Sequence, residues 1–232
     1  ALRLIPGQTG ICAVAASGEP VPDVALLAAE TTATAGTYAF EAASGALSYV
    51  PGVADVGERI FVFRASNSLA VATQIVSATV LAPVGVTVDG QDAVFGAGPG
   101  WTFDGTNIVL HGAARFCLAG AGAEVGVRVP SGTTNAVVAS NLTIAVGAAL
   151  GLPAVHVESG AATEWSLLGS NRLVSGTACA GMEIAGGAVV VFQDNSTGEL
   201  SLEGGAGGAG IGFVAGSGGP GQLDVAGGRI AA

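Results

Sequence analysis

The feature that most constrains this chain is a repeat of short apolar segments in its second half, about 28 residues apart. A first set lies at residues 126–129, 154–157, 181–184 and 210–213 (GVRV, AVHV, GMEI and GIGF). A second set lies at 171–174, 198–201 and 227–230, and a looser third set at 141–144, 164–167, 189–192 and 222–225. Three strands per repeat of near-constant length predict coils that stack on one another.

Alternation along each strand predicts which side chains point inward. In the first set, one inward ladder is Val127, Val155, Met182 and Ile211, and a second is Val129, Val157, Ile184 and Phe213. The intervening residues Arg128, His156, Glu183 and Gly212 then point outward.

The glycine-rich stretch at 202–221 contains Gly205, Gly207 and Gly210 in the spacing G-x-G-x-x-G. That motif indicates a dinucleotide site only where a helix follows it. The following residues, IGFVAGSGGPG, cannot hold a helix. We therefore interpret the stretch as corner, strand and corner, with glycine supplying the positive φ angles of tight corners.

The first half has short alternating segments at 36–40, 46–50 and 59–64, separated by turn-forming residues. These predict a small β-sandwich over residues 1–82, with Phe40, Leu47, Tyr49, Phe61 and Phe63 in its core. The stretch 23–34 is rich in alanine and leucine and supports one short helix at best. Pro83 ends the last sandwich strand, so the second domain spans residues 83–232.

A family resemblance follows from residues 36–80. Gly36, Phe40, Ser44-Gly45, Leu47, Tyr49 and Pro51, then Ala54-Asp55-x-Gly57, then Phe61, Phe63, Ala65 and Asn67 match a recurrent pattern. This pattern resembles that of immunoglobulin-like and cadherin-like modules of secreted bacterial proteins, which implies a spacer or stalk. Cadherin modules bind calcium through clustered acids, which this stretch lacks, so calcium binding is not implied here.

A second resemblance covers residues 126–230 and is closest at its end. GAGIGFVAGSGGPGQLDVAGGRI is similar to a Gly-rich unit of large bacterial surface proteins, although Phe213 and Val214 replace glycines of that pattern. Some proteins of this kind resemble carbohydrate-binding β-helices. The resemblance implies a right-handed parallel β-helix. Because the sequence stops directly after a strand, we expect further coils of the same polypeptide, or a cap, beyond Ala232. The expected fold is thus all-β, an N-terminal immunoglobulin-like sandwich followed by this β-helix.

The charge balance excludes two classes of partner. The chain has 17 acidic and 7 basic residues, all arginine, for a net charge of −10. Such a surface cannot neutralise a phosphate backbone, which argues against nucleic acid, and it repels anionic lipid. No apolar run approaches the roughly 20 residues of a membrane span. The N-terminus shows neither an initiator Met nor a signal peptide, so we expect a mature product or a fragment.

Three cysteines, Cys12, Cys117 and Cys179, are widely spaced, and no zinc-binding pattern occurs. Buried free thiols are the favoured interpretation, and a Cys117–Cys179 disulfide is the alternative. Trp165 and Phe192 are 27 residues apart and are expected to stack in the core.

Three groups of residues are candidate sites. The outward ladder Arg128, His156 and Glu183 could engage a sugar, although paired charges on a solvated surface are the favoured interpretation. Trp101 is expected to cover the open end of the first coil, and an exposed ring there would be a carbohydrate site. Asp89, Asp92 and Asp104 could together hold a calcium ion.

These features favour a non-catalytic, adhesin-like protein, extracellular or on the cell surface, that binds a polysaccharide or a host or matrix glycan. No cofactor is expected apart from that calcium ion. A polysaccharide lyase or hydrolase acting through Arg128, His156 and Glu183 is one alternative. A purely structural stalk is the other.

Overall fold

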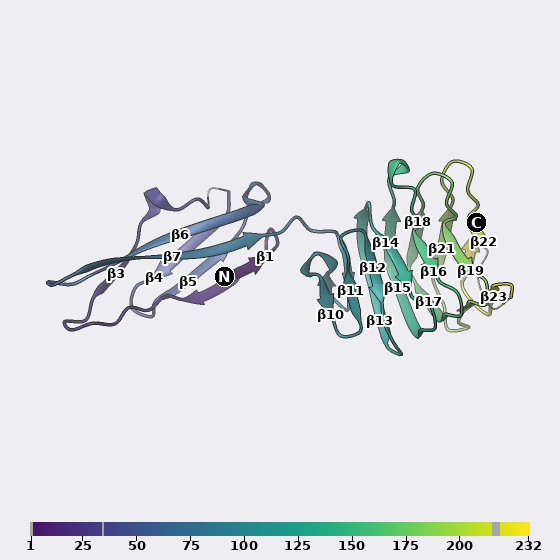
Figure 1. Cartoon of the computed structure of the whole chain (residues 1–232), viewed down its shortest axis with the longest axis horizontal. Coiled ribbons are helices and arrows are strands. Elements are labelled where there is room, and N and C mark those ends of the chain that lie inside the picture. The colour runs from purple at the N-terminus through teal and green to yellow at the C-terminus, as the bar shows by residue number, and fades with distance from the viewer. Residues whose placement is uncertain (1, 34, 215–218) are drawn as a thin grey trace. The chain divides into compact units, whose positions relative to one another are not determined.

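The computed structural model describes residues 2–33, 35–214 and 219–232 (Figure 1). The protein is all-β, with 53% of residues in strands and 5% in helices, and no helix in the described ranges reaches seven residues. None of these described helices is long and apolar enough to cross a membrane. The chain divides into two compact units, Ala1–Pro83 and Val84–Ala232, which we call unit 1 and unit 2.

Unit 1 contains two sheets. The four-stranded sheet has the order β1 (Leu2–Leu4), β7 (Val71–Val80), β6 (Gly57–Ser66) and β3 (Asp23–Leu26). The three-stranded sheet has the order β2 (Gly10–Ala13), β5 (Ala46–Val50) and β4 (Thr37–Glu41), and two short 3₁₀ turns are η1 (Ala28–Glu30) and η2 (Val53–Asp55). Strand β1 runs parallel to the end of β7, whereas the other pairs are antiparallel.

The core of unit 1 follows the predicted alternation. Leu47, Tyr49, Phe61 and Phe63 are buried, and Phe40 is half-buried with its ring edge-on to Phe63 at 4.9 Å. The stretch from residue 23 does not form the short α-helix that its composition allowed. It forms β3 and η1, because pairing of β3 with the end of β6 overrides a weak helix propensity. Thr34, at the end of that stretch, lies outside the described residues.

A buried carboxylate fixes the entry to β6. Asp55 is fully buried, and its oxygens accept hydrogen bonds from the backbone N–H groups of Ala35 (3.1 Å) and Gly52 (3.0 Å). The guanidinium of Arg59 lies 3.4 Å from the same carboxylate. Burial and the neighbouring Asp55 raise the pKa of the Tyr49 hydroxyl. This Asp55 cluster ties the turn before β6 to the start of β4.

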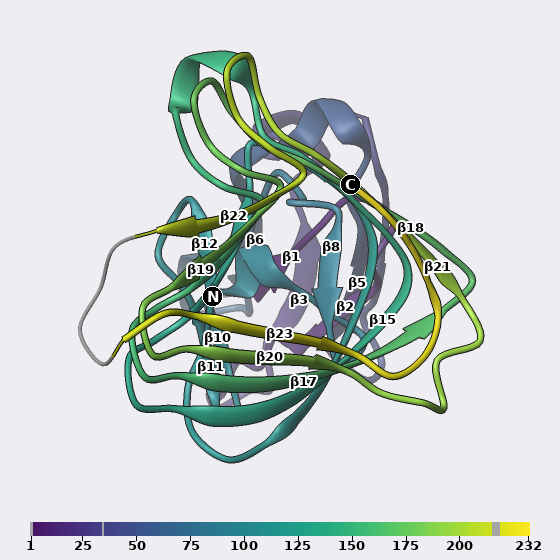
Figure 2. The same cartoon turned by 90° about the vertical axis from the view of Figure 1, so that its right-hand side faces the viewer.

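Unit 2 consists of coils whose strands stack in parallel. What we call the first face has the order β10 (Ala97–Gly98), β11 (Trp101–Phe103), β12 (Asn107–Leu110), β14 (Gly126–Val129), β16 (Val155–Val157), β19 (Met182–Ala185) and β22 (Ile211–Val214). From β12 onward every neighbouring pair on this face is parallel. In Figure 2, β17, β20 and β23 lie over one another on one side of the coil, and β18 and β21 lie on another.

The remaining strands form a sheet that divides into two faces. The main path has the order β9 (Gln91–Asp92), β8 (Val86–Val88), β13 (Arg115–Ala123), β15 (Thr134–Ala145), β17 (Ala162–Leu168), β20 (Val189–Phe192) and β23 (Gln222–Val225). A branch continues from the end of β15 through β18 (Ser170–Val174), β21 (Glu199–Glu203) and β24 (Arg229–Ala231). The chain turns between them at Asn141, whose φ is +49°. We call the main path the second face and the branch the third face. Two further 3₁₀ turns are η3 (Ala93–Phe95) and η4 (Ala148–Leu150).

The register of the first face confirms the sequence prediction. Val127 pairs with Val155, Val155 with Met182, and Met182 with Ile211. Phe213 is the exception, because its side chain is 58% exposed and does not continue the inward ladder.

The predicted register of the other two faces was wrong in part. Asn171 pairs with Leu200 rather than with Gly198, and Glu199 pairs with Arg229 rather than with residue 228. On the second face Val189 pairs with Ala162 rather than with Glu164. Residues 141–144 were grouped with 164–167, 189–192 and 222–225, which lie on the second face. They belong instead to the third face, where Ile144 pairs with Leu173. Corners of unequal length between these strands shift the alignment by one or two residues.

Glycine in residues 204–210 has two distinct roles. Gly207 adopts a positive φ of +83°, as expected for a corner. At Gly205, by contrast, a Cβ would overlap the carbonyl of Gly176 in the preceding coil. Close approach of coil to coil, and not only corner geometry, therefore requires glycine here. Residues 215–218 of the same stretch lie outside the described residues.

The core of unit 2 is a continuous apolar column inside the coils. Trp165 and Phe192 pair in register and are fully buried, with their ring centroids 6.4 Å apart. This confirms the prediction that they are core residues. The thiols of Cys12, Cys117 and Cys179 are all free, so the alternative of a Cys117–Cys179 disulfide is not seen. The expectation that they are buried was wrong, because Cys12 and Cys179 are half-buried and Cys117 is exposed.

Candidate functional site

The outward ladder on the first face is formed as predicted, and its charges are largely paired within the protein. Arg128, His156 and Glu183 lie one above another by strand register. The Nδ1 atom of His156 lies 3.2 Å from Oε2 of Glu183, and Nη1 of Arg128 lies 3.3 Å from Oε1 of Glu158. Glu158 was not among the predicted residues.

Glu158 is held by more than its ion pair. Its Oε2 accepts hydrogen bonds from the backbone N–H (2.9 Å) and the hydroxyl (3.1 Å) of Ser131. Burial disfavours its ionised form, but the bonds from Ser131 and the charges of Arg128 and His156 outweigh burial and lower the pKa of Glu158. These internal bonds leave few free donors or acceptors on the ladder for a ligand.

Trp101 lies inside the first coil. Strand β11 pairs Trp101 with Leu110 of β12, and the side chain is 2% exposed. A ring buried to this extent closes the core and presents no face on which a sugar could stack.

The three aspartates occupy three separate turns. Asp92 is buried and accepts hydrogen bonds from the N–H groups of Val84 (3.1 Å), Gly85 (3.0 Å) and Val94 (2.9 Å). Asp89 accepts one from the N–H of Cys117 at 2.8 Å.

Asp104 caps its own turn, accepting from the N–H groups of Thr106 (3.0 Å) and Asn107 (2.7 Å). Burial opposes its ionisation, yet these bonds prevail and lower its pKa. In the described parts of the chain, no group of three His, Cys, Asp or Glu side chains is placed to hold a metal ion. The structure therefore does not bring Asp89, Asp92 and Asp104 together as a calcium site.

A polar groove of about 180 Å³ lies on the second face. Arg115 on β13, Ala136 on β15 and Glu164 on β17 are in register across three adjacent strands. Their side chains point outward, and both charged residues are exposed. We call this the Arg115–Glu164 groove; it is lined by Arg115, Ala136, Val138, Glu164, Ser166 and Asn195, among others.

The two charged residues of this groove have no partner in the part of the protein that the structure describes. Among the described residues, neither Arg115 nor Glu164 takes part in a side-chain hydrogen bond or an ion pair. Ser166 donates to Oδ1 of Asn195 at 3.0 Å, and among the described residues the Asn195 amide N–H groups have no acceptor, so they can donate to a ligand. A donor wall and an acceptor wall thus face each other across a small apolar floor.

Sequence reasoning missed this groove because of the register error on the second face. Aligning Glu164 with Asn141 separated it from its true neighbour Ala136, and Arg115 was placed in none of the three sets. The spacing between Trp165 and Phe192 carried the correct register of β17 with β20, but not that of β15 with β17.

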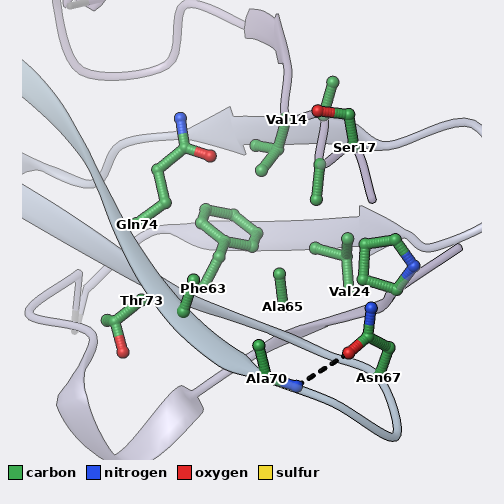
Figure 3. A pocket seen from close by; sticks show the side chains of 13 residues that line it. Val14, Ser17, Val24, Phe63, Ala65, Asn67, Ala70, Thr73 and Gln74 are labelled. Carbon is green, nitrogen blue, oxygen red and sulfur yellow. Dashed lines mark hydrogen bonds between the residues drawn. The ribbon is translucent and has the colours of Figure 1, made fainter. Parts of the chain in front are cut away.

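Unit 1 contains a separate pocket of about 290 Å³, which the sequence did not predict. Figure 3 shows it between β6, β7, β3 and the segment after β2, with Phe63 and several alanines along it and Gln74 at one side. Oδ1 of Asn67 accepts from the N–H of Ala70 at 2.9 Å and so orders one end of the pocket. Its lining carries no charged side chain.

Comparison of the chain with protein-family models, curated proteins and solved structures gave no significant match.

Proposed function

We propose that this chain is a non-catalytic part of an extracellular or cell-surface bacterial protein, and that it binds a glycan of a polysaccharide or matrix. The observation that carries the proposal is the Arg115–Glu164 groove, where a cation, a carboxylate and amide hydrogens that are unpaired among the described residues surround a small apolar floor. Sugars present hydroxyl groups that both donate and accept, together with apolar C–H faces, and these surroundings suit them.

The architecture supports this proposal. Unit 1 is proposed to be an immunoglobulin-like sandwich, in keeping with its three- and four-stranded sheets and its resemblance to secreted modules. Unit 2 is proposed to be a right-handed parallel β-helix, in keeping with parallel ladders on three faces. Regular coils would offer a rigid, extended surface along which a chain-like ligand can lie.

The test is a glycan array combined with a depolymerisation assay on the purified chain, with calcium and with a chelator. We expect binding without cleavage, weakened by Glu164→Gln and unaffected by the control Glu19→Gln in unit 1. Release of unsaturated or reducing ends would instead favour a lyase or hydrolase acting through Arg128, His156 and Glu183. If the assay detects neither binding nor cleavage, the result would favour the structural stalk.

A further inference from the structure

The arginines of unit 2 are not equivalent. Three of them are paired with glutamates on neighbouring strands or corners, namely Arg128 with Glu158, Arg172 with Glu203 and Arg229 with Glu199. In the described part of unit 2, Arg115 alone has no such partner. An unpaired guanidinium facing a groove provides a fork of N–H donors that matches a carboxylate in a bidentate manner.

The opposite wall of the groove restricts what can accompany that carboxylate. Glu164 lies two strands from Arg115, so their backbones are about 10 Å apart. An ionised Glu164 accepts hydrogen bonds from hydroxyl groups and repels a second anionic group of the ligand. Ala136 lies between them, and its short side chain leaves room for a ring.

We infer that the Arg115–Glu164 groove binds a sugar bearing one carboxylate, a hexuronate within an otherwise neutral glycan. The inference rests on the proposed glycan-binding function and specifies its ligand. The carboxylate pairs with Arg115, ring hydroxyls donate to Glu164, and the apolar face of the ring lies on Ala136 and Val138.

The net charge of −10 argues against a densely charged polymer as the ligand. Each uronate beyond the first would meet Glu164 or the acidic remainder of the surface without a free arginine nearby. A single carboxylate flanked by neutral sugars avoids this repulsion.

The experiment measures binding by calorimetry to three probes. They are an oligosaccharide with one glucuronate per repeat unit, the same oligosaccharide with that carboxyl group reduced to the alcohol, and a homopolymeric polyuronate. The proteins are the wild-type chain, Arg115→Gln, Ala136→Leu and the control Arg64→Gln, an exposed arginine of unit 1. Unchanged tryptophan fluorescence and unfolding midpoints verify that each variant is folded.

The expected result is that the glucuronate probe binds the wild-type chain at least about tenfold more tightly than its reduced form does. Arg115→Gln should abolish this preference, Ala136→Leu should weaken binding of the glucuronate probe, and Arg64→Gln should change nothing. The homopolymer should bind more weakly per uronate than the glucuronate probe.

Two results would overturn the inference, and they are distinguishable. Equal binding of the acidic and reduced probes, or a preference that survives Arg115→Gln, overturns the uronate assignment and leaves glycan binding standing. Absence of binding to any probe here and to any glycan of the array overturns the proposed function and the inference together.

Discussion

Asp55 shows how one residue can organise the turns of unit 1. Its carboxylate is buried, receives two backbone N–H groups from different segments and lies beside Arg59. The sequence analysis identified Asp55 only as one position of the pattern in residues 36–80. The structure supplies the physical reason, since a neutral side chain at this position could not accept all of these donors.

Asp55→Asn should therefore destabilise unit 1 by about 3 kcal/mol, because one amide group replaces an acceptor-only carboxylate and leaves buried donors without a partner. Urea unfolding followed through the tyrosines measures the change. The control is Asp23→Asn at an exposed position, which should stay within about 0.5 kcal/mol of wild type.

Glu158 gives unit 2 a dependence on pH. Its pKa is lowered in the folded state from an ordinary value of 4.5. A carboxyl group with a depressed folded pKa stabilises the protein above its unfolded pKa, and that stability is lost as the pH falls through the folded pKa. The free energy of unfolding of unit 2 should decrease on acidification below pH 4.5, and less steeply in Glu158→Gln.

Tryptophan fluorescence in urea at several acidic pH values checks this prediction. Glu164→Gln is the matched control, because that carboxylate has no protein partner in the described chain. Equal pH slopes for wild type and Glu158→Gln would show that the bonds from Ser131 and Arg128 contribute no stability.

At the scale of the element, the coils depend on how closely neighbouring backbones approach. A Cβ on Gly205 would overlap the Gly176 carbonyl, and neither atom can move away by a side-chain rotation. At Gly207 a Cβ meets open space, although φ is positive. The two glycines thus separate crowding between coils from backbone strain within a corner.

Gly205→Ala should cost about 3 kcal/mol, as an overpacked backbone contact does, and Gly207→Ala about 1 kcal/mol, as alanine at positive φ does. Circular dichroism during urea unfolding ranks the two variants. Equal losses, or a larger loss for Gly207→Ala, would contradict the assignment of Gly205 to coil packing.

Much of the element structure could be predicted from the sequence, and the failures share a physical cause. Strands β14, β16 and β19 of the first face are short, carry buried valine, methionine or isoleucine at alternate positions, and recur at nearly equal intervals, so their register was recovered. On the other faces, corner lengths vary and the turn at Asn141 divides one strand between two faces. A register shift of one residue reverses the side to which every side chain points. A register shift of two residues keeps the side but places each side chain beside the wrong neighbour.

The candidate site was harder to predict for the same reason. Arg128, His156 and Glu183 were aligned correctly and turned out to be paired within the protein. The Arg115–Glu164 groove depends on three strands being in correct register at once. Its defining property, the absence of protein partners in the described chain, cannot be seen in a sequence.

At the scale of the whole molecule, the two units have separate hydrophobic cores. Both tyrosines, Tyr38 and Tyr49, lie in unit 1, and both tryptophans, Trp101 and Trp165, lie in unit 2. Each unit therefore carries its own spectroscopic probe.

We expect two unfolding transitions in urea, one seen by tyrosine absorbance and one by tryptophan fluorescence. Asp55→Asn should lower the midpoint of the tyrosine transition and leave the tryptophan transition in place. A common shift of both midpoints would show that the units unfold as one cooperative system.

The parallel pairing of β1 with β7 has a mechanical consequence. These strands open and close unit 1, and Leu2, Arg3 and Leu4 are in register with Ala78, Thr79 and Val80. Tension applied at the two ends of the unit pulls the strands in opposite senses along their length, so the ladder is sheared and its bonds share the load.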